Sequence, residues 1–136
     1  MIAPDSSIVV AALAPWHVAH AAARDALATD DRRLIAHVAI ETTSALSRMP
    51  EGRRIAPALV IEGLERAFPE AWLALDAEGS RAALRAAVDA GVRGGALYDA
   101  LIAMTAEAHG VRLVSADGRA RRTYDAVGVD VTLVTS

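Results

Sequence analysis

Short strand-like segments alternate with longer helical segments along this 136-residue chain. Five segments have the apolar composition or alternation of strands, and at least one helical or arginine-rich stretch separates each from the next. Strands connected through helices pair in parallel, and the helices then cover the sheet. The order therefore predicts one α/β domain with a parallel sheet and helices on both faces. The expected strands are residues 1–5, 33–36, 72–76, 111–117 and 129–134.

Proline, glycine and capping residues mark the ends of the expected helices. Pro15 separates the first two helices, and Pro57 begins the regular part of the fourth. In the amphipathic segment 77–91, the spacing predicts that Leu84 and Val88 point inward. The expected helices are residues 6–14, 16–31, 37–49, 53–69, 77–91 and 96–110, with a short arginine-rich helix or loop over 118–128.

The composition excludes several kinds of chemistry. The chain has no cysteine, which excludes disulfides, zinc–thiolate sites and cysteine nucleophiles. All 14 basic residues are arginine, so mechanisms that need a lysine are also excluded. The N-terminus lacks the features of a signal peptide, and no apolar run reaches the roughly 18 residues of a membrane span. We therefore expect a cytoplasmic protein without a membrane segment.

Four acidic residues occupy positions where ordinary surface charge is not expected. Asp5 and Asp117 follow strands, whereas Glu41 and Asp99 interrupt apolar helical segments. Taken singly, Asp5 could be a helix cap, Asp99 a helix-start carboxylate, and Asp117 part of an Asp-Gly turn. Taken together, all four could meet in the crevice at the carboxyl ends of the parallel strands.

Four neighbouring carboxylates repel one another, which raises their pKa values. A divalent cation removes that conflict. Oxygen ligands without cysteine or a histidine cluster favour Mg²⁺ or Mn²⁺ over zinc. Such ions suit phosphodiester hydrolysis, because they orient an attacking water and offset charge on the phosphate.

Three longer motifs carry a family resemblance. They are "APDSSIVVAAL" at the start, "IETTSALSR" around Glu41, and "LYDALIAMTAEAHGVRLVSAD" from Leu97 to Asp117. In this order the chain resembles the PIN-domain ribonucleases, specifically the VapC-type toxins of bacterial toxin–antitoxin pairs. The resemblance implies a single domain over residues 1–136. It also implies a PIN-like three-layer α/β sandwich, whose central, mostly parallel twisted sheet has about five short strands.

The resemblance further implies a metal-dependent endoribonuclease whose catalytic residues are Asp5, Glu41, Asp99 and Asp117. Asp5, Asp99 and Asp117 would bind Mg²⁺ or Mn²⁺, with Asp5 and Asp99 the most direct ligands. Glu41 and Asp117 would act through water, hold a second ion or help to position the nucleophilic water. Ser7 corresponds to a small polar position that supports the site. The implied partners are a VapB-type antitoxin, an RNA substrate and a second copy of the chain.

Arginines are the candidate RNA contacts. Without the four acids, the formal net charge changes from −3 to +1. Guanidinium groups bind phosphate well, and "DGRARR" beside Asp117 is the best candidate segment. Aromatic residues make up only 4% of the chain, so we expect limited base stacking. The candidate contacts are Arg119, Arg121 and Arg122, followed by Arg48, Arg53 and Arg54.

Two further surfaces remain open to interpretation. His37 begins the helix of Glu41 and could face the crevice, although such histidines are more often helix-end residues with no role in a site. The segment 53–69, with Ile55, Leu59 and Leu64, could form a groove wall for an antitoxin helix or belong to the core.

Other acid-based folds fit less well. A response-regulator receiver relies on a lysine, which this chain lacks. A haloacid-dehalogenase-type phosphatase needs a second Asp at position 7, where this chain has Ser7. The alternative from another class is a non-catalytic PIN-like module that binds RNA or protein, and the complete acidic quartet argues against it.

Overall fold

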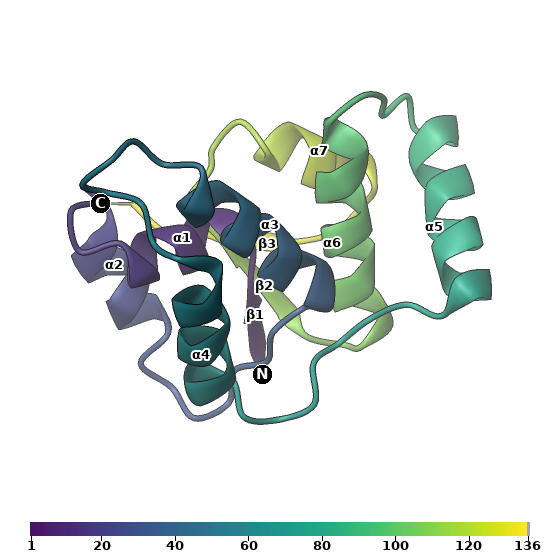
Figure 1. Cartoon of the computed structure of the whole chain (residues 1–136). Helices are drawn as coiled ribbons and strands as arrows, with labels where there is room; N and C mark the ends of the chain where they lie inside the picture. The colour runs from purple at the N-terminus through teal and green to yellow at the C-terminus, as the bar shows by residue number, and fades with distance from the viewer. Residues whose placement is uncertain (136) are drawn as a thin grey trace.

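Three short parallel strands form the sheet in a computed structural model, which describes residues 1–135 (Figure 1). They are β1 (Ile2–Pro4), β2 (Arg112–Ser115) and β3 (Val131–Leu133), in the order β1-β2-β3. In the register, Ala3 pairs with Leu113, and Leu113 pairs with Val131. The strand at the start of the chain therefore lies beside one that begins more than 100 positions later.

The prediction of about five strands is wrong. Residues 33–36 and 72–76 share one isolated parallel bridge, Ile35 with Leu73, and Arg32, just before the first segment, forms another with Ile2. The helix α3 begins at Ala36, directly after these pairings, so the first segment has no length left for a ladder. The two segments extend the sheet only by single bridges.

Seven helices surround the sheet within the described residues (Figure 1). The expected helix over 16–31 is much shorter in the structure. After Pro15 the chain turns, and the Ala19 amide donates to His17 Nδ1, a local bond that competes with helix formation. The helices are α1 (Ser6–Leu13), α2 (His20–Ala26), α3 (Ala36–Ser47), α4 (Pro57–Ala67), α5 (Ala77–Asp89), α6 (Ala96–Ala108) and α7 (Arg121–Ala126).

Both faces of the sheet are covered, as predicted. Successive side chains of a strand point to opposite faces. On β2, Leu113 belongs to the main apolar cluster with Ile102 of α6 and Tyr124 of α7. The next residue, Val114, belongs to a second cluster with Ile8 of α1. Helices therefore pack against both faces of the sheet.

The predicted orientation of α5 is wrong. Leu84 and Val88 are 55% and 50% exposed, and the buried residues are Ala83 and Ala87. The helix lies at the outer edge of the molecule and contacts α6 (Figure 1). Small alanine side chains allow a close approach between the two helices, and the larger side chains remain outside. Among residues 1–135, no helix has the length and apolar character needed to cross a membrane.

Candidate functional site

Asp5 follows the carboxyl end of β1 and has two structural roles there. Its amide donates to the Val114 carbonyl at 2.8 Å, which continues the pairing of β1 with β2. Its side chain caps α1 by accepting hydrogen bonds from the amides of Ser7 and Ile8. Pro4, which precedes it, does not interrupt the pairing of β1 with β2. Backbone N–H groups of successive strand residues point to opposite sides, and the position of the N–H that Pro4 lacks faces away from β2. The cap interpretation of Asp5 is therefore confirmed.

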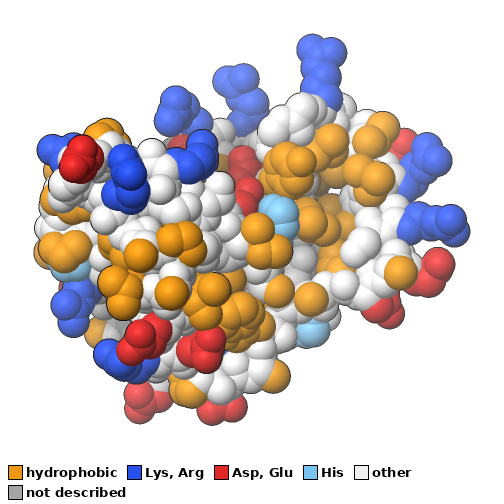
Figure 2. Space-filling view, in the orientation of Figure 1, with side chains coloured by type: hydrophobic (Ala, Val, Ile, Leu, Met, Phe, Trp, Pro, Cys, Tyr) orange, Lys and Arg blue, Asp and Glu red, His pale blue; other side chains and the backbone are white. Residues whose placement is uncertain are grey.

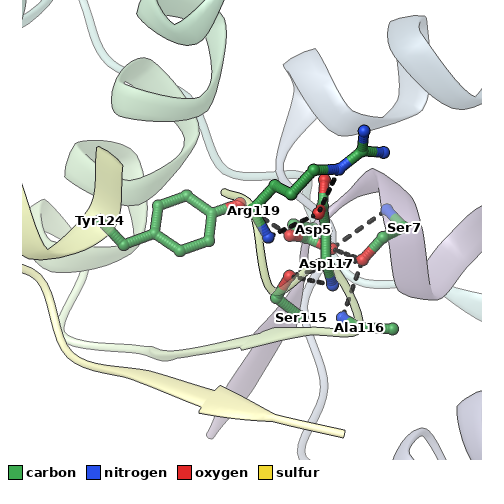
Figure 3. A network of polar contacts seen from close by, with 7 residues as sticks. All are labelled: Asp5, Ser7, Ser115, Ala116, Asp117, Arg119 and Tyr124. Carbon is green, nitrogen blue, oxygen red and sulfur yellow. Dashed lines mark hydrogen bonds and ion pairs between the residues drawn. The ribbon is translucent and has the colours of Figure 1, made fainter. Parts of the chain in front are cut away.

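The Asp5 carboxylate is 3% exposed but well compensated (Figure 3). Its Oδ1 accepts from the Ser7 amide at 3.0 Å, the Ile8 amide at 3.4 Å and the Ser7 hydroxyl. Its Oδ2 accepts from the Tyr124 hydroxyl at 2.7 Å. Burial, together with the charge of Asp5, raises the pKa of Tyr124 well above its usual range, so the phenol remains a donor. A buried charge with this many donors is held in one orientation.

Ser7 links Asp5 to the strand end that carries Asp117 (Figure 3). Its hydroxyl accepts from the Ala116 amide at 2.8 Å and lies 3.4 Å from the Ser115 hydroxyl. Ser115 Oγ in turn accepts from the Asp117 amide at 3.0 Å. The Asp117 carboxylate accepts from the Arg119 amide at 2.9 Å, so Asp117 also forms the predicted turn. The network joins the two strand ends through hydroxyl groups.

Sequence reasoning missed Tyr124 and Ser115. Ser115 has a weak signal, because a hydroxyl stands at the end of a strand two residues before Asp117. Tyr124 has no local signal, since it lies 119 positions from Asp5 and in an arginine-rich segment. Only the fold brings its hydroxyl to the carboxylate.

An open crevice of about 780 Å³ lies over this network. Glu41, Asp99 and Asp117 line it together with Ser6 and Ser7. Asp5 is not among the lining residues and lies buried beneath them. Figure 2 shows acidic side chains in a recess near the centre of one face, with hydrophobic side chains beside it and arginines at the rim.

Glu41 projects from α3 toward the start of α1. Its Oε1 accepts from the Ser6 hydroxyl at 2.9 Å. Its Oε2 lies 3.4 Å from His37 Nε2, one helical turn earlier, without the geometry of a hydrogen bond. His37 also lines the crevice.

Asp99 occupies the first turn of α6 and is half-buried. Its pKa is raised from 3.8 to about 6, first by burial and then by the negative charges of Glu41, Asp5 and Asp117. Those charges act on Asp99 only because the fold brings the four acids within electrostatic reach. The quartet thus converges from β1, α3, α6 and the end of β2.

The donor set suits a hard cation. Its atoms are carboxylate and hydroxyl oxygens, which Mg²⁺ and Mn²⁺ prefer. Within residues 1–135, no three Asp, Glu or His side chains are arranged as a ready-made metal cage. Mg²⁺ keeps several waters and is commonly bound through one or two carboxylates. The residues therefore fit a hydrated ion at the crevice better than a fully dehydrated one.

The candidate arginines separate into two groups. Arg119 and Arg48 line the crevice. Arg119 is 98% exposed, and its Nε lies 3.8 Å from Asp117 Oδ1. Arg121 and Arg122 lie on α7, outside the crevice lining, and Arg121 faces Asp125 at 3.9 Å.

Comparisons with known proteins agree with this architecture. The PIN domain family matches residues 2–126. Ribonuclease VapC40 of Mycobacterium tuberculosis (strain H37Rv) is 46% identical over 135 residues, which span 99% of this chain and 100% of that protein. Ribonuclease VapC27 of the same strain is 35% identical over 132 residues, spanning 97% of this chain and 96% of that protein.

Solved structures show the same fold. A crystal structure of FitAcB from Neisseria gonorrhoeae superposes with a TM-score of 0.70 at 22% identity, covering 97% of this chain and 96% of that one. A structure of FitAB bound to an IR36 DNA fragment also gives a TM-score of 0.70, at 21% identity, covering 98% and 94%. With the family match over most of the chain and two VapC relatives above 30% identity, the chain belongs to the PIN-domain family and, within it, to the VapC group.

Proposed function

We propose that the chain is a single-domain, metal-dependent endoribonuclease that acts in the cytoplasm as the toxin of a VapBC-type toxin–antitoxin pair. The observation that carries this proposal is the near-full-length 46% identity to ribonuclease VapC40, combined with an acidic crevice. The four acids come from separate elements, yet their charges act on one carboxylate, Asp99. Repulsion among four gathered carboxylates destabilises the fold, and a hydrolase that binds a cation there has a use for them.

In this proposal Asp5, Asp99 and Asp117 hold Mg²⁺ or Mn²⁺. When bound, the ion would orient a water for attack on the phosphodiester and offset charge on the phosphate. Asp5 supplies an oxygen whose position is set by Ser7, Ile8 and Tyr124. Asp99 supplies a carboxylate with no hydrogen-bond donor of its own among residues 1–135, which is free to bind a cation. Glu41, oriented by Ser6, positions water at the other wall of the crevice.

RNA phosphates meet the arginines at the crevice before they meet the acids. Arg119 is nearly fully exposed beside Asp117, so its guanidinium can contact a phosphate next to the metal. Arg121 and Arg122 are exposed on α7 and can contact only a more distant part of the backbone. Their contribution is therefore smaller than that of Arg119.

A VapB-type antitoxin and a second copy of the chain complete the proposal. Support for a protein partner comes from α4, where Leu59 and Ile61 are 62% and 43% exposed. Leu64 of the same helix is buried in the core, so only one face of α4 is available to a partner helix. Light scattering of the purified chain would show whether it dimerises.

The test is cleavage of RNA by the purified, antitoxin-free chain. We expect cleavage with Mg²⁺ or Mn²⁺, loss of cleavage with EDTA, and growth arrest when the chain is expressed alone. Full activity of both Asp5→Asn and Asp99→Asn would show that the site assignment is wrong. A chain that binds RNA but never cleaves it would instead support the non-catalytic binding module.

A further inference from the structure

A pair of stacked aromatic rings stands at the crevice. Tyr98, next to Asp99 on α6, stacks on His37 of α3 with ring centroids 5.4 Å apart and planes only 5° from parallel. Both side chains line the crevice that holds Glu41, Asp99 and Asp117. In a chain with 4% aromatic residues, this arrangement is not explained by core packing, because Tyr98 remains 55% exposed.

The surroundings of Tyr98 favour a flat, weakly polar ligand. The ring borders the acids on one side and an apolar groove between α5 and α6 on the other, lined by Leu84, Leu97 and Leu101. Figure 2 shows hydrophobic side chains gathered beside the acidic recess. A phosphate would be repelled by Glu41 and Asp99, whereas an uncharged nucleobase would not. Bases stack on exposed aromatic rings with little regard to sequence.

We propose that the His37–Tyr98 pair is a stacking platform for an unpaired nucleobase beside the scissile phosphate. His37 holds one face of the Tyr98 ring, so the ring is ordered before the base arrives. The platform rests on the proposed function and narrows its substrate class to RNA that is single-stranded at the cleavage site. A base inside a duplex is already stacked on its neighbours and could not reach the ring.

Three variants test the platform. Tyr98→Leu removes the ring, Tyr98→Phe keeps it, and Val88→Ala truncates an exposed apolar side chain of α5 that lines neither the crevice nor the apolar groove. The probe is a single-stranded RNA that carries 2-aminopurine, measured in EDTA so that no cleavage occurs. We expect wild type, Tyr98→Phe and Val88→Ala to quench the probe, and Tyr98→Leu to lose the quenching and bind about tenfold more weakly.

A matched cleavage assay separates this inference from the proposed function. With Mg²⁺ or Mn²⁺, kcat/KM on the same RNA should fall about tenfold in Tyr98→Leu and by less than about twofold in Tyr98→Phe. Wild-type protein that cleaves no RNA would overturn the proposed function. The quenching assay needs no cleavage, so it would still test whether a base stacks on Tyr98. Tyr98→Leu with wild-type quenching and affinity would overturn the platform.

Two controls keep the result interpretable. Melting temperatures of all variants are compared first, and Tyr98→Gln removes the ring with another good helix former if the leucine variant folds poorly. Light scattering then tests whether the ring serves a protein interface instead. Unchanged RNA binding with an altered oligomeric state in Tyr98→Leu would also overturn the platform.

Discussion

Asp5 and Asp99 lie in the same electrostatic neighbourhood but in opposite surroundings. Asp5, at the end of β1, is buried and accepts hydrogen bonds from Ser7, Ile8 and Tyr124. Asp99, on α6, is half-buried, and no hydrogen bond reaches its carboxylate within the described part of the chain. Its pKa is raised to about 6 by burial and by the other three acids.

The contrast separates two tasks within one site. The fold satisfies Asp5 by itself, so this carboxylate is oriented whether or not a cation is present. The fold leaves Asp99 in conflict with its neighbours, and only a cation or a proton relieves that conflict. In the proposed site, Asp5 would thus be a fixed anchor, and Asp99 would be the group whose charge depends most on what binds.

The largest expected effect is shared by both acids and would test whether the contrast matters for activity. Asp5→Asn and Asp99→Asn should each lower RNA cleavage more than ~100-fold, because we propose both as direct ligands and the loss of a direct ligand should cost more than the loss of an outer-shell partner. Asp30→Asn, at an exposed acid outside the crevice, is the control and should retain activity. Initial rates of cleavage of a fluorescent RNA provide the measurement. Full activity of either Asp5→Asn or Asp99→Asn would contradict the prediction.

Tyr124→Phe tests how far Asp5 depends on its donors. The variant loses one hydrogen bond to Asp5 and should lower cleavage about 10–100-fold, as changes in outer-shell partners do. Tyr98→Phe loses a hydroxyl with no role in the site and is the matched control. Mn²⁺ affinity measured by calorimetry should weaken in Tyr124→Phe alone. Equal affinities in the two variants would show that the Asp5 network is not needed for orientation.

The two acid variants should shift stability in opposite directions. In Asp5→Asn, the side-chain NH₂ group faces hydroxyl and backbone N–H donors that lose their acceptor. The variant should therefore destabilise the fold by about 1–3 kcal/mol. Asp99→Asn removes a repelled charge and should stabilise the metal-free protein at pH 7.5 by about 1 kcal/mol, allowing for screening of a half-exposed group. Urea unfolding in EDTA measures both. Changes of the same sign in the free energy of unfolding of both variants would contradict the contrast between Asp5 and Asp99.

The stability gain of Asp99→Asn should depend on pH. An acid whose folded-state pKa is raised binds more protons when folded, so its contribution favours folding at low pH and is lost as pH rises. With a change from 3.8 to about 6, the advantage of Asp99→Asn should grow between about pH 4 and pH 6 and then remain constant. Melting temperatures in EDTA across pH 4–8 test this. A constant difference over the whole range would contradict the raised pKa.

The smallest expected effect concerns the crevice rim. Arg119→Ala should weaken RNA binding a few-fold and reduce the salt-dependence slope by about 1, because one phosphate contact is lost. Arg81→Ala, on the outer side of α5, is the matched control with similar exposure. Binding titrations at several salt concentrations distinguish them. Equal slopes for both variants would remove Arg119 from the RNA path.

Much of the fold could be predicted from local patterns. The order of strands and helices, the parallel sheet and the start of α4 at Pro57 follow from apolar periodicity and capping residues. The number of strands did not follow, because residues 33–36 look like a strand yet form only one isolated bridge before α3 begins. The orientation of α5 also depended on packing, since alanines rather than Leu84 and Val88 contact the interior.

The sequence by itself determined which chemistry is possible. It contains four acids in unusual settings, no cysteine and no lysine, and these residue types favour a site built from oxygen ligands. It also determined that Asp5 and Asp117 follow strands, which predicts a shared edge of the sheet. Each of these conclusions rests on residues close together in the chain.

Only the tertiary structure decided how the acids differ from one another. Tyr124 reaches Asp5 across 119 positions, and His37 stacks on Tyr98 from another helix. The raised pKa of Asp99 comes from burial and from acids on three other segments. Hydrogen bonds, burial and repulsion between distant segments depend on distances in space, and a local pattern of residues does not contain those distances.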